Sequence, residues 1–227
     1  YFDRMLCHRQ QLIDGDFDWI IAHELFHHWF GDLVTAESWA NLTINESFAD
    51  YSEYLWYDFR DGKDEGDAVK YKSTQKYFRT YKYKNEPIVN YYYVHPSDVF
   101  DGIRYEKGGA VLHMLRYYVG DDAFFKSLNK FLQQYKFNNA ELSDLRKCFE
   151  ETTGEDLNWF FNQWWLDKGH PILDITHQFD EKNKTIALTV RQTQRSIDGP
   201  TFRIPTKVDI YSNNTKETKV IDITDRI

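Results

Sequence analysis

The clearest hydrophobic pattern lies in the second half of the chain, where apolar residues recur at helical spacing. Gly154 is placed to end one of these helices, and Lys168-Gly169 ends another before Pro171. Such stripes are typical of core faces of short helices joined by tight turns, which predicts a helical bundle. The stripes are Phe124, Leu128, Phe131, Leu132 and Tyr135; Leu142, Leu145, Phe149 and Thr152; and Leu157, Phe160, Phe161, Trp164 and Trp165.

At Pro171 the period changes from helical to alternating. Polar turn sequences at 180–183 and 212–214 separate the apolar runs, as in β-hairpins. We therefore expect a mainly α domain over 1–170 and a small all-β domain, or part of one, over 171–227. The strands are expected at 172–179, 184–192, 202–211 and 218–223.

The first half of the chain is more irregular. A helix that is apolar around most of its circumference should follow Asp16 or Asp18 and end at Gly31-Asp32. A second helix should run from Thr43 to Phe59. We expect Trp39 and Trp56 in the core. The remaining segments are predicted as a polar loop over 61–67, a helix over 68–81 and a long ordered loop over 84–104.

Composition excludes some classes of function. The net charge is −8 and no Lys/Arg run is present, so a nucleic-acid partner is not expected. No apolar run approaches the roughly 20 residues of a membrane span. Cys7 and Cys148 are interpreted as free thiols. The sequence starts at Tyr1 without a methionine, which suggests a piece of a longer protein.

The candidate chemistry lies in the sequence His-Glu-Leu-Phe-His. His23 and His27 are four residues apart, so on a helix both imidazoles project from one face. After eighteen intervening residues, Glu46 begins a second helix and can return a carboxylate to the first. Two imidazoles and one carboxylate leave an open coordination position, which is typical of hydrolytic zinc sites. We predict one zinc ion per chain, bound by these three residues.

The neighbours of the predicted ligands have separate interpretations. Glu24 points to another side of the helix and is the candidate general base for a water molecule. Asp50 or Glu53 could orient a ligand histidine, although a solvent-exposed acid is nearly as good an interpretation. His28 is interpreted as a packing or surface residue. The same applies to His8, His95, His113, His170 and His177, which show no ligand spacing.

Two blocks, HELFHHWFGDLVTAESWANLTINESFADY and IRYEKGGAVLHML, resemble the aminopeptidase N family of zinc gluzincins. The resemblance covers about residues 10–170 and implies a thermolysin-like catalytic fold followed by a small β domain. It also implies that Tyr105, before a Lys-Gly pair, supplies the hydroxyl that stabilises the oxyanion. One departure is Ser47, where the family usually has glycine; a small residue there is not expected to abolish metal binding.

The resemblance also implies a missing part. Family members carry a Gly-x-Met-Glu-Asn motif that binds the substrate's α-amino group, and its expected place falls just before Tyr1. The preceding N-terminal domain is absent too. We expect a parent enzyme that removes N-terminal residues from peptides, and a fragment that cleaves poorly. The alternatives are a zinc endopeptidase with the same site and a non-catalytic peptide-binding protein on this fold.

Overall fold

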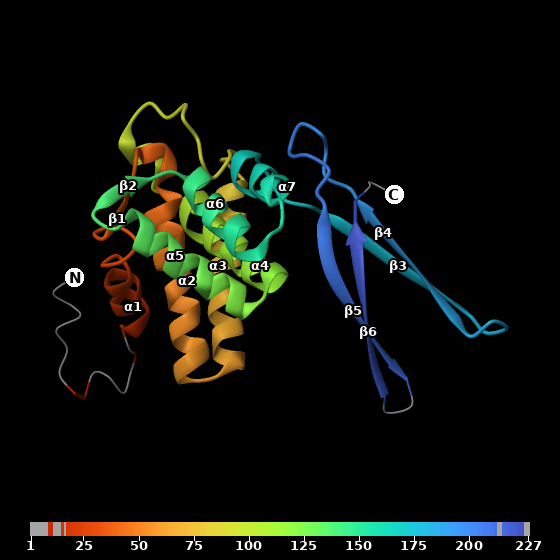
Figure 1. Ribbon diagram of the computed structural model, residues 1–227. Helices are drawn as coiled ribbons and strands as arrows, with labels where there is room; N and C mark the ends of the chain where they lie inside the picture. The colour runs from red at the N-terminus through yellow and green to blue at the C-terminus, as the bar shows by residue number, and fades with distance from the viewer. Residues whose placement is uncertain (1–8, 11–14, 16, 213–214, 225–227) are drawn as a thin grey trace. The chain divides into compact units, whose positions relative to one another are not determined.

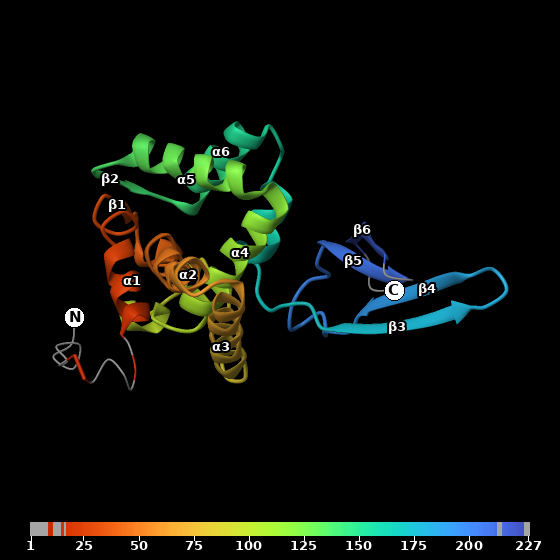
Figure 2. The ribbon, with the colours of Figure 1, turned by 90° about the horizontal axis from the view of Figure 1, so that it is seen from below.

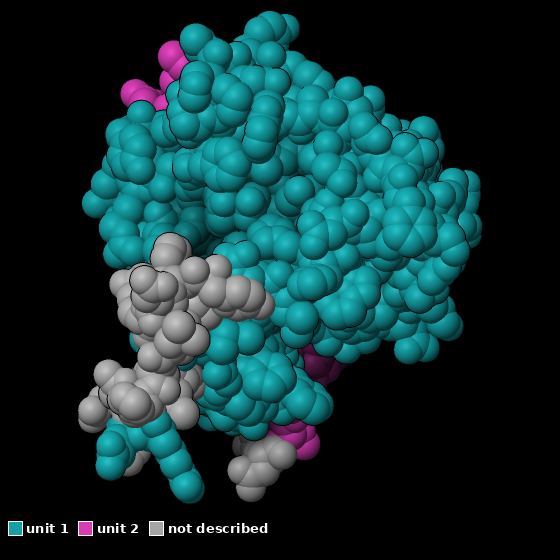
Figure 3. All heavy atoms as spheres, turned by 90° about the vertical axis from the view of Figure 1, so that its left-hand side faces the viewer, with its two compact units in different colours: residues 1–166 teal, residues 167–227 magenta. Residues whose placement is uncertain are grey.

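The computed structural model describes residues 9–10, 15, 17–212 and 215–224. The chain divides into two compact units, Tyr1–Leu166 and Asp167–Ile227, which Figure 3 colours teal and magenta. The first is mainly helical and the second is made of strands, so the expected fold class is confirmed. The change of period at Pro171 lies just beyond this division, and the division into domains 1–170 and 171–227 stays a prediction.

Helices make up most of the first unit (Figure 1). The α-helices are α1 (Asp18–Phe26), α2 (Thr43–Arg60), α3 (Lys63–Tyr81), α4 (Gly108–Val119), α5 (Asp121–Tyr135), α6 (Leu142–Thr153) and α7 (Asn158–Phe161). Short 3₁₀ turns, η3 (Trp39–Asn41) and η4 (Pro96–Val99), and π-helical turns, η5 (Ile103–Lys107) and η6 (Asn162–Leu166), connect them.

Helix α2 is the central element of this unit. It packs against α1, α3, α4 and η5, and Figures 1 and 2 show it between α1 on one side and α3 and α4 on the other. Its first half is buried on nearly every side, including the polar side chains of Thr43, Glu46, Ser47 and Asp50. Buried polar groups are costly unless they are paired, so this helix concentrates the polar contacts that organise the unit.

The connection between α1 and α2 is held by a small parallel sheet. Strand β1 (Val34–Ala36) pairs with β2 (Asn138–Ala140), which precedes α6. Two asparagine amides add to this link: Asn41 Oδ1 accepts from the Leu142 amide at 3.0 Å, and Asn45 Oδ1 accepts from the Ala36 amide at 3.1 Å. The link sets where α2 begins relative to the end of α1.

Three expectations about the first unit are wrong. Helix α1 ends at Phe26 rather than at Gly31-Asp32, because the following residues form turns and the Asp32 amide bonds the His27 carbonyl. Helix α3 begins at Lys63 within the expected polar loop, where acidic residues favour a helix start. Trp39 and Trp56 are 43% and 36% exposed rather than in the core.

The second unit contains two antiparallel hairpins. Strand β3 (Leu173–Asp180) pairs with β4 (Thr185–Gln192), and β5 (Ile204–Ser212) pairs with β6 (Thr215–Ile223). Their bounds agree closely with the alternation in the sequence. Around Phe202, which is fully buried, the side chain of Gln192 donates to the Phe202 carbonyl and accepts from its amide.

In the part of the chain that the structure describes, no helix combines the length and the apolar character that crossing a bilayer requires. Cys148 is buried and free, and Cys7 lies outside the described residues.

Candidate metal centre

The two histidines of the His-Glu-Leu-Phe-His sequence stay on one face although α1 is short. His23 lies within the helix and is buried, and His27 is the C-cap residue with helical backbone angles, φ −60° and ψ −22°. The helical spacing therefore continues through His27, and the ring centroids are 5.0 Å apart. The chain then reverses at Gly31, where φ is +153° and a Cβ would lie 2.9 Å from the His27 carbonyl oxygen.

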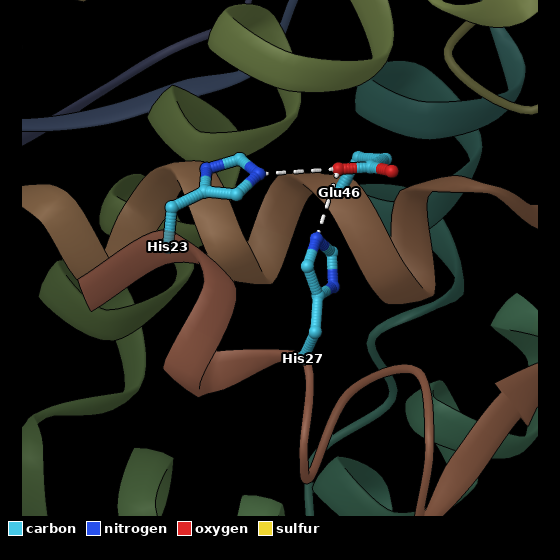
Figure 4. A group of neighbouring side chains, drawn as sticks. All are labelled: His23, His27 and Glu46. Carbon is cyan, nitrogen blue, oxygen red and sulfur yellow. Dashed lines mark ion pairs between the residues drawn. The ribbon is translucent and has the colours of Figure 1, made fainter. Parts of the chain in front are cut away.

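Glu46 reaches both histidines from the first turn of α2. Its Oε2 atom lies 3.4 Å from Nε2 of His23 and 3.4 Å from Nε2 of His27, and both rings point toward this carboxylate in Figure 4. The potential ligand atoms of the three residues lie within 4.8 Å of one another, as a shared metal ion requires. The predicted ligands are thus brought together.

The second ring nitrogen of each histidine is held by another group. Nδ1 of His27 lies 3.1 Å from the Phe30 carbonyl oxygen. Because a carbonyl oxygen can only accept, Nδ1 is the donor. Nδ1 of His23 lies 3.0 Å from Oε1 of Glu53. A neutral ring that carries its proton on Nδ1 presents a lone pair at Nε2, so these contacts direct two lone pairs toward Glu46.

Three acceptor atoms facing one another require a positive charge between them. Among the described residues, Oε2 of Glu46 is buried and makes no hydrogen bond of good geometry. In the metal-free site protons supply the charge: burial lowers the pKa of His23, but Glu46 and Glu53 outweigh it and raise that pKa to about 9. Burial likewise raises the pKa of Glu46, and the two histidines lower it to about 2. The donor set fits a divalent cation.

Glu24 lies beside the three converging residues, not among them. It is half-buried and lines an open cavity of about 480 Å³ together with His27 and Glu46. His28 is exposed and lines the same cavity. A carboxylate at this place can exchange a proton with a molecule bound in the cavity.

Tyr105 comes from the π-helical turn η5, far along the chain. Its ring stacks on His23, with centroids 6.0 Å apart and planes 9° from parallel. Burial raises the pKa of the Tyr105 hydroxyl well above its usual range, and the charge of Glu46 and a hydrogen bond to it act in the same direction. The phenol therefore remains a hydrogen-bond donor at neutral pH.

The structure separates the two acids that the sequence left open. Glu53 is the group that contacts His23. Asp50 instead accepts a hydrogen bond from Ser73 at 3.3 Å, and burial raises the pKa of Asp50 well above its usual range. The Phe30 carbonyl was missed as a partner of His27, because a backbone contact of this kind has no signature in the sequence.

The family of the chain follows from its similarity to known proteins. Residues 10–164 match the peptidase family M1 domain. The chain belongs to peptidase family M1. Aminopeptidase N of Streptomyces lividans is 36% identical over 183 residues, which cover 76% of this chain and 21% of that protein. The tricorn protease-interacting factor F2 of Thermoplasma volcanium is 36% identical over 184 residues, 79% of this chain and 23% of that protein.

Solved structures show the same fold. Aminopeptidase A of Legionella pneumophila, solved with aspartic acid, aligns with a TM-score of 0.72 at 20% identity, covering 92% of this chain and 23% of that one. An M1 zinc metallopeptidase of Deinococcus radiodurans aligns with a TM-score of 0.56 at 26% identity, covering 66% and 33%. The chain spans 20–26% of the length of the first curated relatives it matches.

Proposed function

We propose that this M1 chain carries the catalytic centre of a zinc-dependent aminopeptidase that acts on peptides. The observation that supports this most strongly is the convergence of His23, His27 and Glu46, with Glu24 lining a cavity beside them and the Tyr105 ring stacked on His23. In this proposal one zinc ion is bound by those three side chains. When bound, zinc polarises a carbonyl oxygen and lowers the pKa of water so that hydroxide is available near neutrality.

Glu24 and Tyr105 divide the remaining chemistry. Glu24 accepts a proton as the water oxygen bonds to the carbonyl carbon of the scissile peptide. The Tyr105 hydroxyl donates a hydrogen bond to the negative oxygen of the tetrahedral intermediate. As the carbon–nitrogen bond breaks, Glu24 passes its proton to the leaving amine. The cavity that Glu24 shares with His27 and Glu46 is the place where the peptide would bind.

Replacement of Glu24 tests the chemistry directly. Glu24→Gln should retain zinc and lower peptide turnover by about 10²–10⁴-fold, because it removes the base and keeps the shape. Glu181→Gln, in the exposed turn between β3 and β4, is the matched control and should retain both zinc and turnover. A zinc-loaded Glu24→Gln protein with normal turnover would contradict the proposed base.

Blocked peptides test the preference for a free N-terminus. The name of the relative from Streptomyces lividans supports an aminopeptidase rather than an endopeptidase. With the whole protein, we expect cleavage of peptides with a free α-amino group and none of the same peptides after N-acetylation. Equal cleavage of both would favour the endopeptidase. Zinc-dependent peptide binding with no cleavage of either would favour the non-catalytic alternative.

A further inference from the structure

Ser47, the residue directly after Glu46, connects α2 to the segment that carries Tyr105. It is fully buried, and its hydroxyl donates a hydrogen bond of 2.6 Å to the carbonyl oxygen of Arg104. That carbonyl belongs to the peptide bond between Arg104 and Tyr105. Two adjacent residues of α2 therefore contact two parts of the proposed active centre. Glu46 contacts the histidines through its carboxylate, and Ser47 contacts the backbone next to Tyr105.

The hydrogen bonds around Ser47 have one consistent direction. A serine hydroxyl has a single hydrogen, and Ser47 donates it to Arg104, so the 2.6 Å contact with Thr43 Oγ1 must be one in which Thr43 donates. Thr43 in turn accepts from the indole nitrogen of Trp165 at 3.0 Å. The result is a buried chain of donors from Trp165 through Thr43 and Ser47 to the Arg104 carbonyl. Aligned bonds of this kind reinforce one another in a low-dielectric interior.

Close packing at Gly108 and Gly109 holds the start of α4 tightly against α2. A Cβ on Gly108 would lie 1.9 Å from Ser47 Oγ, and a Cβ on Gly109 would lie 2.4 Å from Asp50 Oδ2. The start of α4 therefore approaches α2 at a distance that only glycine allows. The intervening turn η5 is π-helical, and such turns are frequent at functional sites.

We infer that Ser47 is a positioning residue for Tyr105: its hydroxyl fixes the Arg104–Tyr105 peptide against α2 and so holds the phenol beside the three metal-binding residues. This inference rests on the proposed function of Tyr105. Loss of the hydroxyl leaves the Arg104 carbonyl and the Thr43 hydroxyl buried without this bond, and η5 gains freedom to move. A small displacement of a catalytic group lowers the rate of the chemical step without loss of the metal ligands.

The matched control is Ser52 on the same helix. It is also buried, but its hydroxyl donates to the Ala49 carbonyl within α2, at 2.7 Å. Ser52→Ala removes a buried hydroxyl from α2 without touching η5. Thr43→Val is a graded variant, because it removes the donor to Ser47 and leaves the bond from Ser47 to Arg104 in place.

Amide hydrogen exchange in the metal-free protein gives a readout that does not depend on activity. Ser47→Ala should accelerate exchange over residues 103–108 by about tenfold, the effect of losing one buried hydrogen bond to this segment. Ser52→Ala should leave exchange in this segment unchanged, and Thr43→Val should have an intermediate effect. Equal exchange over 103–108 in wild type and Ser47→Ala would overturn the inference.

Kinetics of the zinc-loaded protein distinguish positioning from general stability. Ser47→Ala should lower kcat by about tenfold with KM and zinc content unchanged, and Tyr105→Phe by about 10²-fold or more. In a Tyr105→Phe background, Ser47→Ala should have no further effect, because its target is gone. An equal loss of kcat in both backgrounds would overturn the inference about Ser47 and leave the proposed role of Tyr105 intact. Normal turnover of zinc-loaded Tyr105→Phe would instead refute the proposed role of Tyr105, and the inference with it.

Discussion

Two histidines pack against helix α2 from different helices, and their surroundings are opposite in charge. His23 on α1 faces Glu46 and Glu53, which raise its pKa to about 9 against the effect of burial. His113 on α4 is half-buried beside Lys70 and Arg116; burial and these two cations lower its pKa to about 4. Burial lowers the pKa of both rings, so the opposite directions of their pKa shifts come from the neighbouring charged groups.

The two rings nevertheless use their nitrogen atoms in the same way. Nε2 of His113 lies 3.2 Å from Nζ of Lys70, which can only donate, so Nδ1 carries the proton and meets the Tyr51 hydroxyl at 3.2 Å. In His23 Nδ1 meets Glu53, and Nε2 faces Glu46. At His113 the cation that the Nε2 lone pair requires is part of the protein. At His23 the Nε2 atom faces the Glu46 carboxylate, and in the proposed function a metal ion supplies the cation.

Replacement of either histidine should show the largest difference between the two sites. We expect His23→Ala to lose zinc and all measurable peptidase activity, because two ligands cannot retain the metal at the affinity of three. His113→Ala should keep zinc, since its Nε2 faces Lys70. Metal analysis after dialysis compares the two proteins. Stoichiometric zinc in His23→Ala would refute its assignment as a ligand.

A smaller effect is expected from the partners of Nδ1. Glu53→Gln should weaken zinc binding by about 10–100-fold, because the carboxylate orients His23 and increases its basicity. Tyr51→Phe removes the corresponding partner of His113 and should leave zinc affinity unchanged. Competition with a chelator measures both affinities. If the two variants bound zinc equally well, the carboxylate would have no role in tuning the metal.

The smallest effect should appear in the stability of the metal-free protein as a function of pH. The folded pKa of His113 is lowered from 6.5 to about 4, so its contribution is present above pH 6.5 and is lost as the pH falls toward 4. The folded pKa of His23 is raised from 6.5 to about 9, so its contribution is present below pH 6.5 and is lost as the pH rises toward 9. The two histidines thus act in separate pH ranges.

Urea unfolding of His113→Gln and His23→Gln at pH 5, 7 and 9 measures this separation. We expect the difference between wild type and His113→Gln to shrink by about 1 kcal/mol from pH 7 to pH 5, after allowance for solvent screening of a partly solvated ring. The difference in free energy of unfolding between wild type and His23→Gln should shrink from pH 7 to pH 9. A change for both variants in the same pH range would contradict the assigned charges.

Much of the candidate site could be predicted from local sequence. The spacing of His23 and His27 places both on one helix face wherever the helix forms, and the structure keeps that face although α1 ends at Phe26. The alternation after Pro171 predicted the four strands closely. These predictions succeed because helix and strand periodicity depend on neighbours in the chain.

The periodicity of apolar residues does not predict contacts between distant segments. Three tyrosines precede Pro96 in the segment Tyr91-Tyr92-Tyr93, and nothing in local periodicity separates them from Tyr105, which only the family resemblance singled out. Exposed Trp39 and Trp56 show the same limit, because a tryptophan is buried only if another element covers it.

Local sequence predicts most of the helices, the strands and the residue types able to bind a metal ion, although it misplaces the end of α1 and the start of α3. Tertiary structure decided which acid contacts His23, which cation faces His113, and that Ser47 bonds the backbone beside Tyr105. The physical reason is that a hydrogen bond forms, and a neighbouring charge shifts a pKa strongly, only when the two groups lie within a few ångströms of each other. They depend on which helices pack together around α2, whereas periodicity depends only on position along one helix.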